Sequence, residues 1–138
     1  MVHANDLMCG NLLFDKDGIL VTVDARTIFD IWNSSKEYNP IPLTAEWMHR
    51  ADGVVPNLGF YENEDWFMLP CIEVAFYQNI ELEKATPYRP LPVLPVRVYV
   101  LDIPNGSNGF VSFNIQYVHE LQNLFYLKTK EQLKFKHT

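Results

Sequence analysis

The sequence has few cysteines and no long apolar run, and each shortage excludes a class of protein. Only Cys9 and Cys71 occur among the 138 residues, which is too few for a disulfide framework, and their spacing does not match a paired-cysteine zinc site. We expect both to be reduced thiols in the core. No stretch approaches the roughly 20 apolar residues of a membrane helix, and the N-terminal residues lack the basic start and apolar run of a signal peptide. The sequence therefore predicts a cytoplasmic protein with no membrane segment.

The residue patterns of common catalytic and cofactor sites are also missing. There is no G-x-G-x-x-G or G-K-[ST] motif to hold a phosphate group. Asp15-Lys16-Asp17-Gly18 begins like a calcium loop, but Arg26 stands where the bidentate carboxylate is needed. Cys71 lacks the electropositive sequence surroundings that would activate a thiol for catalysis with His49 or His119. We therefore predict that the protein is not an enzyme and has no catalytic residue, no metal site and no cofactor.

One motif comes close to a metal site. His119-Glu120-Leu121-Gln122-Asn123 matches the zinc-peptidase pattern H-E-x-x-H except at its last position. The pattern works because two imidazoles one helical turn apart bind the same ion, and the amide of Asn123 is a poor substitute. We favour a solvated or partner-facing polar stripe on a helix.

What the sequence does contain is enough apolar material for one folded core. Hydrophobic residues make up 48% of the chain and charged residues 20%, the reverse of the composition that is typical of disorder. A chain of this length buries roughly two thirds of its unfolded surface on folding. We therefore expect residues 1–138 to form a single domain.

Turn residues and apolar periodicity divide the chain into strands and two helices. Asp15–Gly18 is a predicted hairpin turn, and residues around Pro56 are expected to form a loop. Thr44 is a predicted N-cap for a short helix at 45–51, and Tyr117–Lys128 follows the period of an amphipathic helix. We place strands at 7–14, 19–24, 27–32, 66–69, 72–77, 93–103 and 110–117. The predicted fold class is α+β, with antiparallel β-hairpins that form a small sheet or an SH3-like barrel.

Three short segments of the chain form a distinctive set. They are Gly10–Leu13 (GNLL), Asn39–Trp47 (NPIPLTAEW) and Tyr117–Phe125 (YVHELQNLF). Together they are similar to a large group of small proteins, without established activity, that bacteriophages and prophages encode. The resemblance covers most of the chain in outline and implies a viral or mobile-element accessory role. Members of the group usually close the last helix with a glycine, and Lys130 stands at that position.

The charge is unevenly distributed along the chain. Residues 1–127 carry 7 basic and 16 acidic side chains, a net charge of -9, and residues 128–138 carry 4 basic and 1 acidic, a net charge of +3. Because cationic side chains supply most of the affinity for nucleic acid, the acidic body disfavours it as a partner except through the basic tail. Leu133 and Phe135 alternate with the lysines of this tail, which favours a lysine-protected terminal strand over a phosphate contact.

These observations favour a protein that acts by binding another protein in the cytoplasm of the host cell. The lead hypothesis is a non-enzymatic accessory factor of a phage or prophage that inhibits a host defence nuclease or its RNA-guided complex, as an anti-CRISPR does, because an acidic surface complements a basic channel. The alternatives are a nucleic-acid-binding accessory protein and a minor virion component; the partner and the oligomeric state stay open. The predicted partner-binding residues are His119, Gln122, Asn123, Tyr126, Tyr61 and Trp66.

Overall fold

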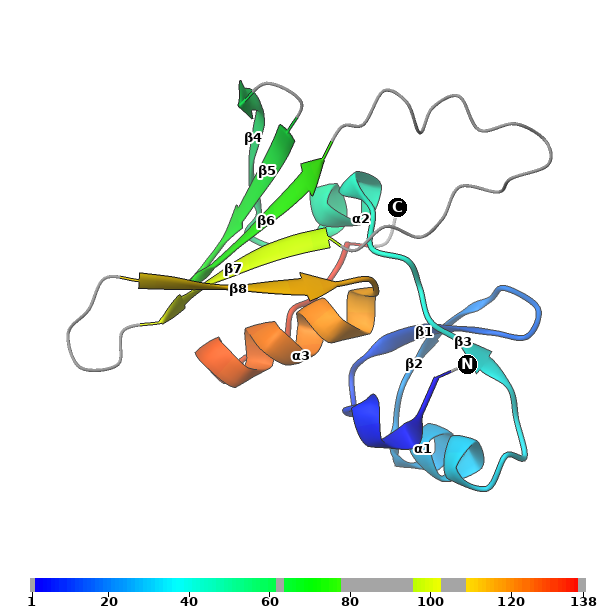
Figure 1. The fold of residues 1–138 in the computed structure, drawn as a ribbon. Helices are drawn as coiled ribbons and strands as arrows, with labels where there is room; N and C mark the ends of the chain where they lie inside the picture. Colours follow the sequence, from blue (N-terminus) through cyan, green and yellow to red (C-terminus); the bar gives the residue numbers. More distant parts are fainter. Residues whose placement is uncertain (1, 62–63, 78–95, 103–108, 137–138) are drawn as a thin grey trace. The chain divides into compact units, whose positions relative to one another are not determined.

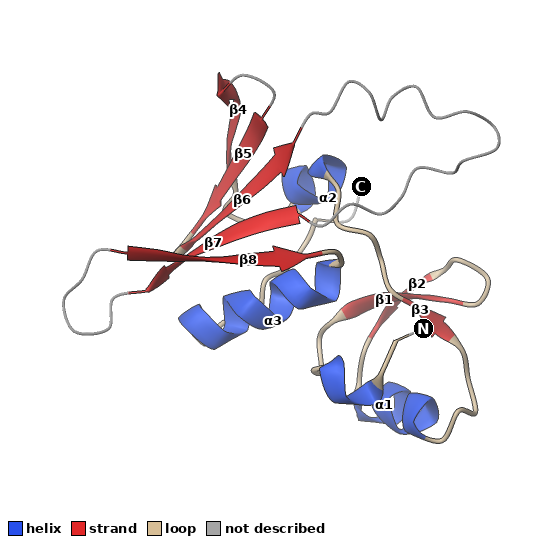
Figure 2. Cartoon of the chain, viewed as in Figure 1, coloured by secondary structure: helices blue, strands red, loops and turns tan. Residues whose placement is uncertain are grey.

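The computed structural model describes residues 2–61, 64–77, 96–102 and 109–136, and it divides the chain into two compact units. Unit 1 is built from Met1–Leu43 and Tyr117–Leu133, and unit 2 from Thr44–Gln116 and Lys134–Thr138. Each unit has its own open antiparallel sheet (Figures 1 and 2). The predicted α+β class is confirmed. Both sheets are open, so of the two predicted arrangements the small sheet is correct and the SH3-like barrel is not. The single domain stays a prediction, since the chain passes between the units three times.

Unit 1 contains a three-stranded antiparallel sheet in the order β2-β1-β3. A short 3-10 helix, η1 (Ala4–Asp6), precedes the three strands, which are β1 (Leu12–Asp15), β2 (Leu20–Thr22) and β3 (Tyr38–Asn39). The β1–β2 hairpin turns where the sequence predicts it. The Asp15 carboxylate accepts the backbone N–H groups of Asp17 and Ile19, both at 2.9 Å. Gly18 takes a φ of +80°, which glycine adopts at little cost.

Helix α1 (Ala25–Trp32) occupies the segment where we expected a strand at 27–32, so that prediction was wrong. Asp24 and Thr27 form a capping box, in which the Asp24 carboxylate accepts the Thr27 backbone N–H at 2.8 Å and the Thr27 hydroxyl accepts the Asp24 N–H at 3.4 Å. The same contacts with Thr27 lower the pKa of Asp24. Cap and tertiary packing together outweigh the β propensity of Ile28 and Ile31. Both isoleucines pack against a core formed by Val2, Leu7, Leu13 and Val23.

Helix α3 (Val118–Thr129) lies within one residue of its predicted bounds. At its start, the Glu120 carboxylate accepts the Tyr117 N–H at 3.2 Å, and the Val118 N–H donates to the Ile41 carbonyl at 2.9 Å. At its end, Lys130 adopts a left-handed conformation with a φ of 61°. Glycine is the usual residue in this conformation after a helix.

Unit 2 contains a five-stranded antiparallel sheet in which successive strands are neighbours. Strand β6 matches its predicted bounds, and β5, β7 and β8 overlap theirs. Strand β4 replaces the loop that we expected around Pro56, so that prediction was wrong. Proline is tolerated there because β4 is an edge strand. The strands are β4 (Val55–Tyr61), β5 (Glu64–Leu69), β6 (Ile72–Tyr77), β7 (Val96–Asp102) and β8 (Gly109–Ile115).

One face of this sheet forms the core of unit 2. The register places Phe67, Val74 and Val98 side by side on three successive strands, and all three are fully buried. Helix α2 (Ala45–Arg50) begins at the predicted N-cap, where the Thr44 hydroxyl accepts the N–H of Trp47 at 3.3 Å. The ring of His49 on α2 packs edge-on against Phe67, with 5.0 Å between centroids. The helix therefore contacts the buried face of the sheet.

The basic C-terminal tail is divided between the units, since residues 128–133 belong to unit 1 and residues from 134 onward to unit 2. Phe135 is buried, pairs with Ala51 in an isolated β-bridge and packs edge-on against Trp47 at 5.4 Å. The Lys136 N–H donates to the Arg50 carbonyl at 2.6 Å. These contacts show a structural role for the tail with its lysines exposed, but residues 128–136 form the end of α3 and one isolated β-bridge, so the terminal strand that we expected was wrong.

We predict that Lys130→Gly stabilises the protein. An L-residue in the left-handed region costs roughly 1–2 kcal/mol, and the greater freedom of glycine in the unfolded chain offsets only part of the gain. The free energy of unfolding from urea titration should rise by about 0.5–1 kcal/mol. As a matched control, Lys128→Gly puts glycine inside α3 and should lower that free energy by about 1 kcal/mol. A loss of stability in Lys130→Gly would contradict the left-handed helix end.

Candidate functional site

The four polar residues predicted on the last helix lie on α3, but they do not form an exposed stripe. His119 and Gln122 are buried, with 5% and 6% of their surface exposed. Asn123 is half-buried, and Tyr126 is exposed at 38%. The expectation of a solvated or partner-facing stripe is therefore wrong for His119 and Gln122. Their role has to be sought in contacts inside unit 1.

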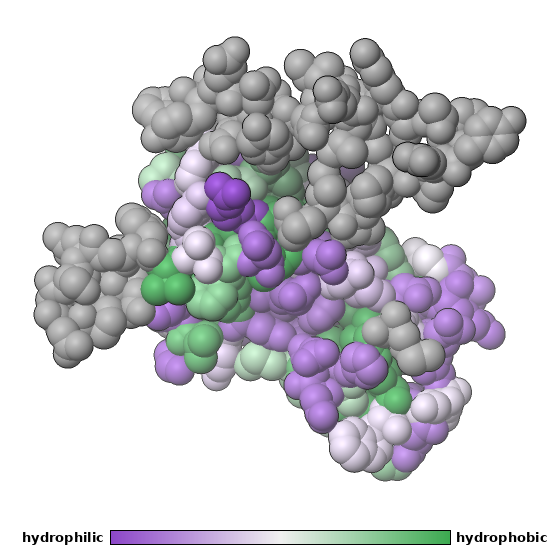
Figure 3. All heavy atoms as spheres, in the orientation of Figure 1, coloured by the Kyte–Doolittle hydropathy of each residue, from purple (hydrophilic) through white to green (hydrophobic). Residues whose placement is uncertain are grey.

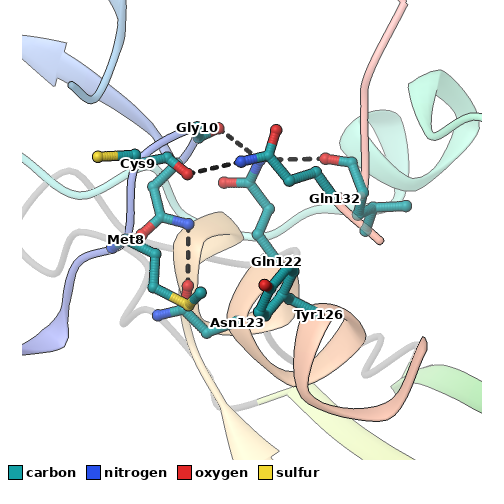
Figure 4. A pocket seen from close by; sticks show the side chains of 9 residues that line it. Met8, Cys9, Gly10, Gln122, Asn123, Tyr126 and Gln132 are labelled. Carbon is teal, nitrogen blue, oxygen red and sulfur yellow. Dashed lines mark hydrogen bonds between the residues drawn. The ribbon is translucent and has the colours of Figure 1, made fainter. Parts of the chain in front are cut away.

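The carboxamide of Gln122 joins three segments of unit 1. Its Oε1 accepts the backbone N–H of Leu12 at 2.9 Å. Its Nε2 donates to the carbonyls of Gly10 and Leu133, both at 3.2 Å (Figure 4). Glutamine can do this because its amide carries an acceptor and two donor hydrogens. The oxygen and both donor hydrogens of this carboxamide are thereby engaged within the protein.

Two further carboxamides hold the same N-terminal segment. Asn123 accepts a hydrogen bond from the Asn11 side chain and donates to the Asp6 carbonyl, both at 2.9 Å. Gln132 donates to the Cys9 carbonyl at 2.6 Å. We call Gln122, Asn123 and Gln132 the amide clamp. Figure 4 shows its side chains converging on residues 8–10.

Gly10 is favoured at the clamp mainly by its backbone conformation, and the Gln132 carboxamide packs closely over it. Its φ is +96°, and a Cβ at this position would collide with the carboxamide of Gln132. By contrast, Gly18 has a similar backbone conformation but open space where a Cβ would be. The glycine of the GNLL segment therefore permits a close approach as well as a turn.

The clamp borders a shallow hollow with little free volume. The hollow is lined by residues of the clamp together with Met8–Asn11, Tyr126 and Leu133, and its volume is about 10 Å³. That is room for about one water molecule.

The thiols of Cys9 and Cys71 are exposed, so our expectation that they belong to the core is wrong. The hollow is too small for a substrate, although an exposed cysteine stands beside it.

His119 is buried without a full set of partners. Its Nδ1 has no hydrogen-bond partner, and its ring stacks on that of Tyr117 at 5.8 Å with an interplanar angle of 9°. Burial lowers the pKa of His119, because the charged imidazolium loses hydration, and the carboxylates of Glu120 and Asp6 partly oppose this. The side chain is therefore held mostly neutral near pH 7.

The other members of the H-E-x-x-N motif have structural partners of their own. Glu120 caps α3, and the amide of Asn123 belongs to the clamp. Within residues 2–61, 64–77, 96–102 and 109–136, no three side chains of His, Cys, Asp or Glu are grouped so that they could hold a metal ion.

The two aromatic residues of the predicted site belong to unit 2. Trp66 is half-buried and stacks on Tyr99, with 5.2 Å between centroids and an interplanar angle of 18°. Ala75 lies opposite Trp66 in the register, and its small side chain leaves room for this stack. Tyr61 ends β4 and pairs with Glu64, and its side chain lies outside the described part of the structure.

Sequence reasoning missed the most exposed aromatic pair of the described residues. Phe29 and Trp32 on α1 are 59% and 68% exposed. The Asp24 and Thr27 capping box was the signal that could have found them, since a helix that begins there places Phe29 and Trp32, three residues apart, on one face. Apolar residues, green in Figure 3, reach the surface among polar ones on the face shown.

Comparisons with known proteins give no relative for this chain: no family model, no curated protein and no solved structure matches it. In the described part of the chain, no helix combines the length and the apolar character needed to cross a membrane. The interpretation of function therefore depends on the chain's own surfaces and contacts.

We predict that Gln122→Leu strongly destabilises the protein. Leucine fills a similar volume but leaves one backbone N–H and two carbonyls without their partner, at about 1–3 kcal/mol for each buried group. The free energy of unfolding should fall by about 3 kcal/mol or more in urea titration. Gln132→Leu is the matched control, because Gln132 is exposed and makes one bond of the clamp, and it should cost no more than about 1 kcal/mol. Equal effects of the two changes would contradict the central role of Gln122.

We predict that the protein becomes less stable as the pH is lowered below about 6.5, because of His119. The pKa of His119 in the folded protein is lowered from the usual 6.5. Below pH 6.5 the unfolded chain therefore takes up a proton that the folded chain does not. Unfolding becomes more favourable until the pH reaches the folded pKa. Urea titrations between about pH 7.5 and 5.5 should show a steeper loss in the wild type than in His119→Phe, which cannot titrate there. Parallel profiles for the two proteins would contradict this assignment.

Proposed function

We propose that this chain is a non-enzymatic accessory factor of a phage or prophage that acts by binding a host protein. The observation that carries the proposal is the exposed pair Phe29 and Trp32, three residues apart on α1. Aromatic side chains of this size supply much of the binding energy when a partner buries them. Because the capping box holds α1 in shape, the pair is ordered before binding, which lowers the entropic cost of association.

The surroundings of this pair support a protein partner. Arg26 and Lys36 both form ion pairs with Asp30, at 3.4 and 3.8 Å, and their own side chains are 82% and 66% exposed. Glu37 is exposed nearby in the sequence. An apolar aromatic centre beside charged residues of both signs is the usual composition of a protein interface. It lacks the one-sided positive charge that a phosphate backbone requires.

The proposed partner is a host defence nuclease or its RNA-guided complex. The chain has a net charge of -6, which complements the basic channels in which such enzymes hold nucleic acid. Tyr126 and Trp66 remain candidate contacts from the original set, and Tyr61 stays a prediction. In this proposal Phe29 and Trp32 replace His119 and Gln122 as partner-binding residues, because the latter two are buried.

The test is affinity capture from a bacterial host lysate with the full-length chain as bait. Wild type should recover a host protein that the double variant Phe29→Ser and Trp32→Ser recovers at least about tenfold less, since hot-spot residues contribute roughly 2 kcal/mol or more each. Leu127→Ser is the matched control, because Leu127 is 61% exposed and lies on α3. Addition of the wild type should also slow nucleic-acid cleavage by the captured partner.

Other outcomes would favour other functions. Equal recovery with the wild type and the double variant would contradict the α1 surface as the binding site. Nucleic-acid binding that weakens steeply with salt and is lost in Lys134→Gln with Lys136→Gln would favour the nucleic-acid alternative. These substitutions are preferable to removal of the tail, because Phe135 is buried between the two lysines. Copurification with phage particles would favour a virion component.

A further inference from the structure

The two outer strands of the unit 2 sheet differ in how they present their free edge. Strand β4 pairs only with β5, and β8 pairs only with β7. Each therefore has a row of backbone N–H and C=O groups on the side away from its neighbour. Such an edge can take up another strand unless something in its sequence or shape prevents it.

Strand β4 carries features that prevent pairing. Pro56 has no backbone N–H to donate. The register of β4 against β5 also shifts between Leu58 and Tyr61. Proline and local irregularity are two of the means by which natural sheets protect an edge.

Strand β8 carries none of these features. Its seven residues, GFVSFNI, include no charged residue and no proline. Its register against β7 is continuous from Val96 opposite Ile115 to Asp102 opposite Gly109. Residues 111–114 are all exposed, Val111 at 41% and Phe113 at 42%. Within the described residues, no segment other than β7 forms a backbone hydrogen bond with 109–115. Among the described residues, this edge is regular, uncharged and without a second backbone partner.

We infer that β8 pairs with β8 of a second copy of this chain, antiparallel and about a two-fold axis at Ser112, so that one sheet runs through both copies. In this register Val111 of each copy lies opposite Phe113 of the other, which is a favourable cross-strand pair of a β-branched and an aromatic residue. The contact is thus self-complementary, as a two-fold interface must be.

Charge does not oppose a second copy at this strand, although it does over most of the surface. Each chain has a net charge of -6, so two copies repel each other where acidic surfaces meet. The neutral β8 edge is a place where they can approach without opposing like charges across the paired strands. The inference is independent of the proposed function, since α1 belongs to unit 1 and β8 to unit 2.

The test is the mass of the full-length protein in solution, measured by sedimentation from micromolar to millimolar concentration. The wild type should form a reversible dimer of twice 16.1 kDa. Val111→Lys with Phe113→Lys should raise the dissociation constant at least about tenfold, because lysines then oppose one another. Met68→Lys is the matched control: Met68 is also 42% exposed but lies on the interior strand β5, and it should leave the dimer unchanged.

A charge-exchange experiment excludes a folding defect as the cause. Ser112→Lys and Ser112→Glu should each be monomeric alone, because the changed residue meets its own copy, and a mixture of the two should dimerise. A wild type that stays monomeric at millimolar concentration would overturn the inference. This holds whatever the β8 variants do in the affinity capture, because that experiment tests the proposed function. Failure of the mixture to dimerise, or equal weakening by Met68→Lys, would overturn the pairing about Ser112.

Discussion

The described part of unit 1 depends on one buried carboxamide. Gln122 meets a backbone N–H of Leu12 and the carbonyls of Gly10 and Leu133. These groups belong to segments that do not pair with one another as helix or sheet, and a buried backbone group without a partner costs about 1–3 kcal/mol. A side chain with both an acceptor and donors can satisfy all three at once. This is why a polar residue, rather than an apolar one, stands in the buried part of α3.

The same constraint explains why polar residues that suggested chemistry are structural in this protein. Glu120 caps its helix, and Asn123 holds Asn11 and the backbone of the N-terminal segment. The two surfaces proposed for partners among the described residues differ in kind. On α1, the exposed rings of Phe29 and Trp32 offer apolar area, whereas β8 offers backbone hydrogen-bonding groups. The α1 surface suits an unrelated protein with an apolar pocket, and the β8 edge suits the same strand of a second copy.

Predictions from the sequence succeeded where the signal was local. The Asp15–Gly18 turn, the Thr44 cap and the bounds of α3 each depend on residues within a few positions of one another. The strand expected at 27–32 failed because β-branched residues were weighted above the capping box that precedes them, although both signals are in the sequence. Strand β4 was missed because Pro56 indicates a break unless the strand is known to lie at an edge, and position in a sheet is not a local property.

The amino-acid sequence alone predicts the α+β class, the turns and the start of α2. These features follow from steric and hydrogen-bonding preferences over short stretches. The sequence was not sufficient to show that Gln122 is buried and Trp32 exposed. Residue type suggests the opposite for each, and the outcome depends on partners 110 positions away in the case of Gln122 and Leu12. Long-range packing decides which side chains are used to hold the fold and which are left for a partner, and only the folded protein contains that information.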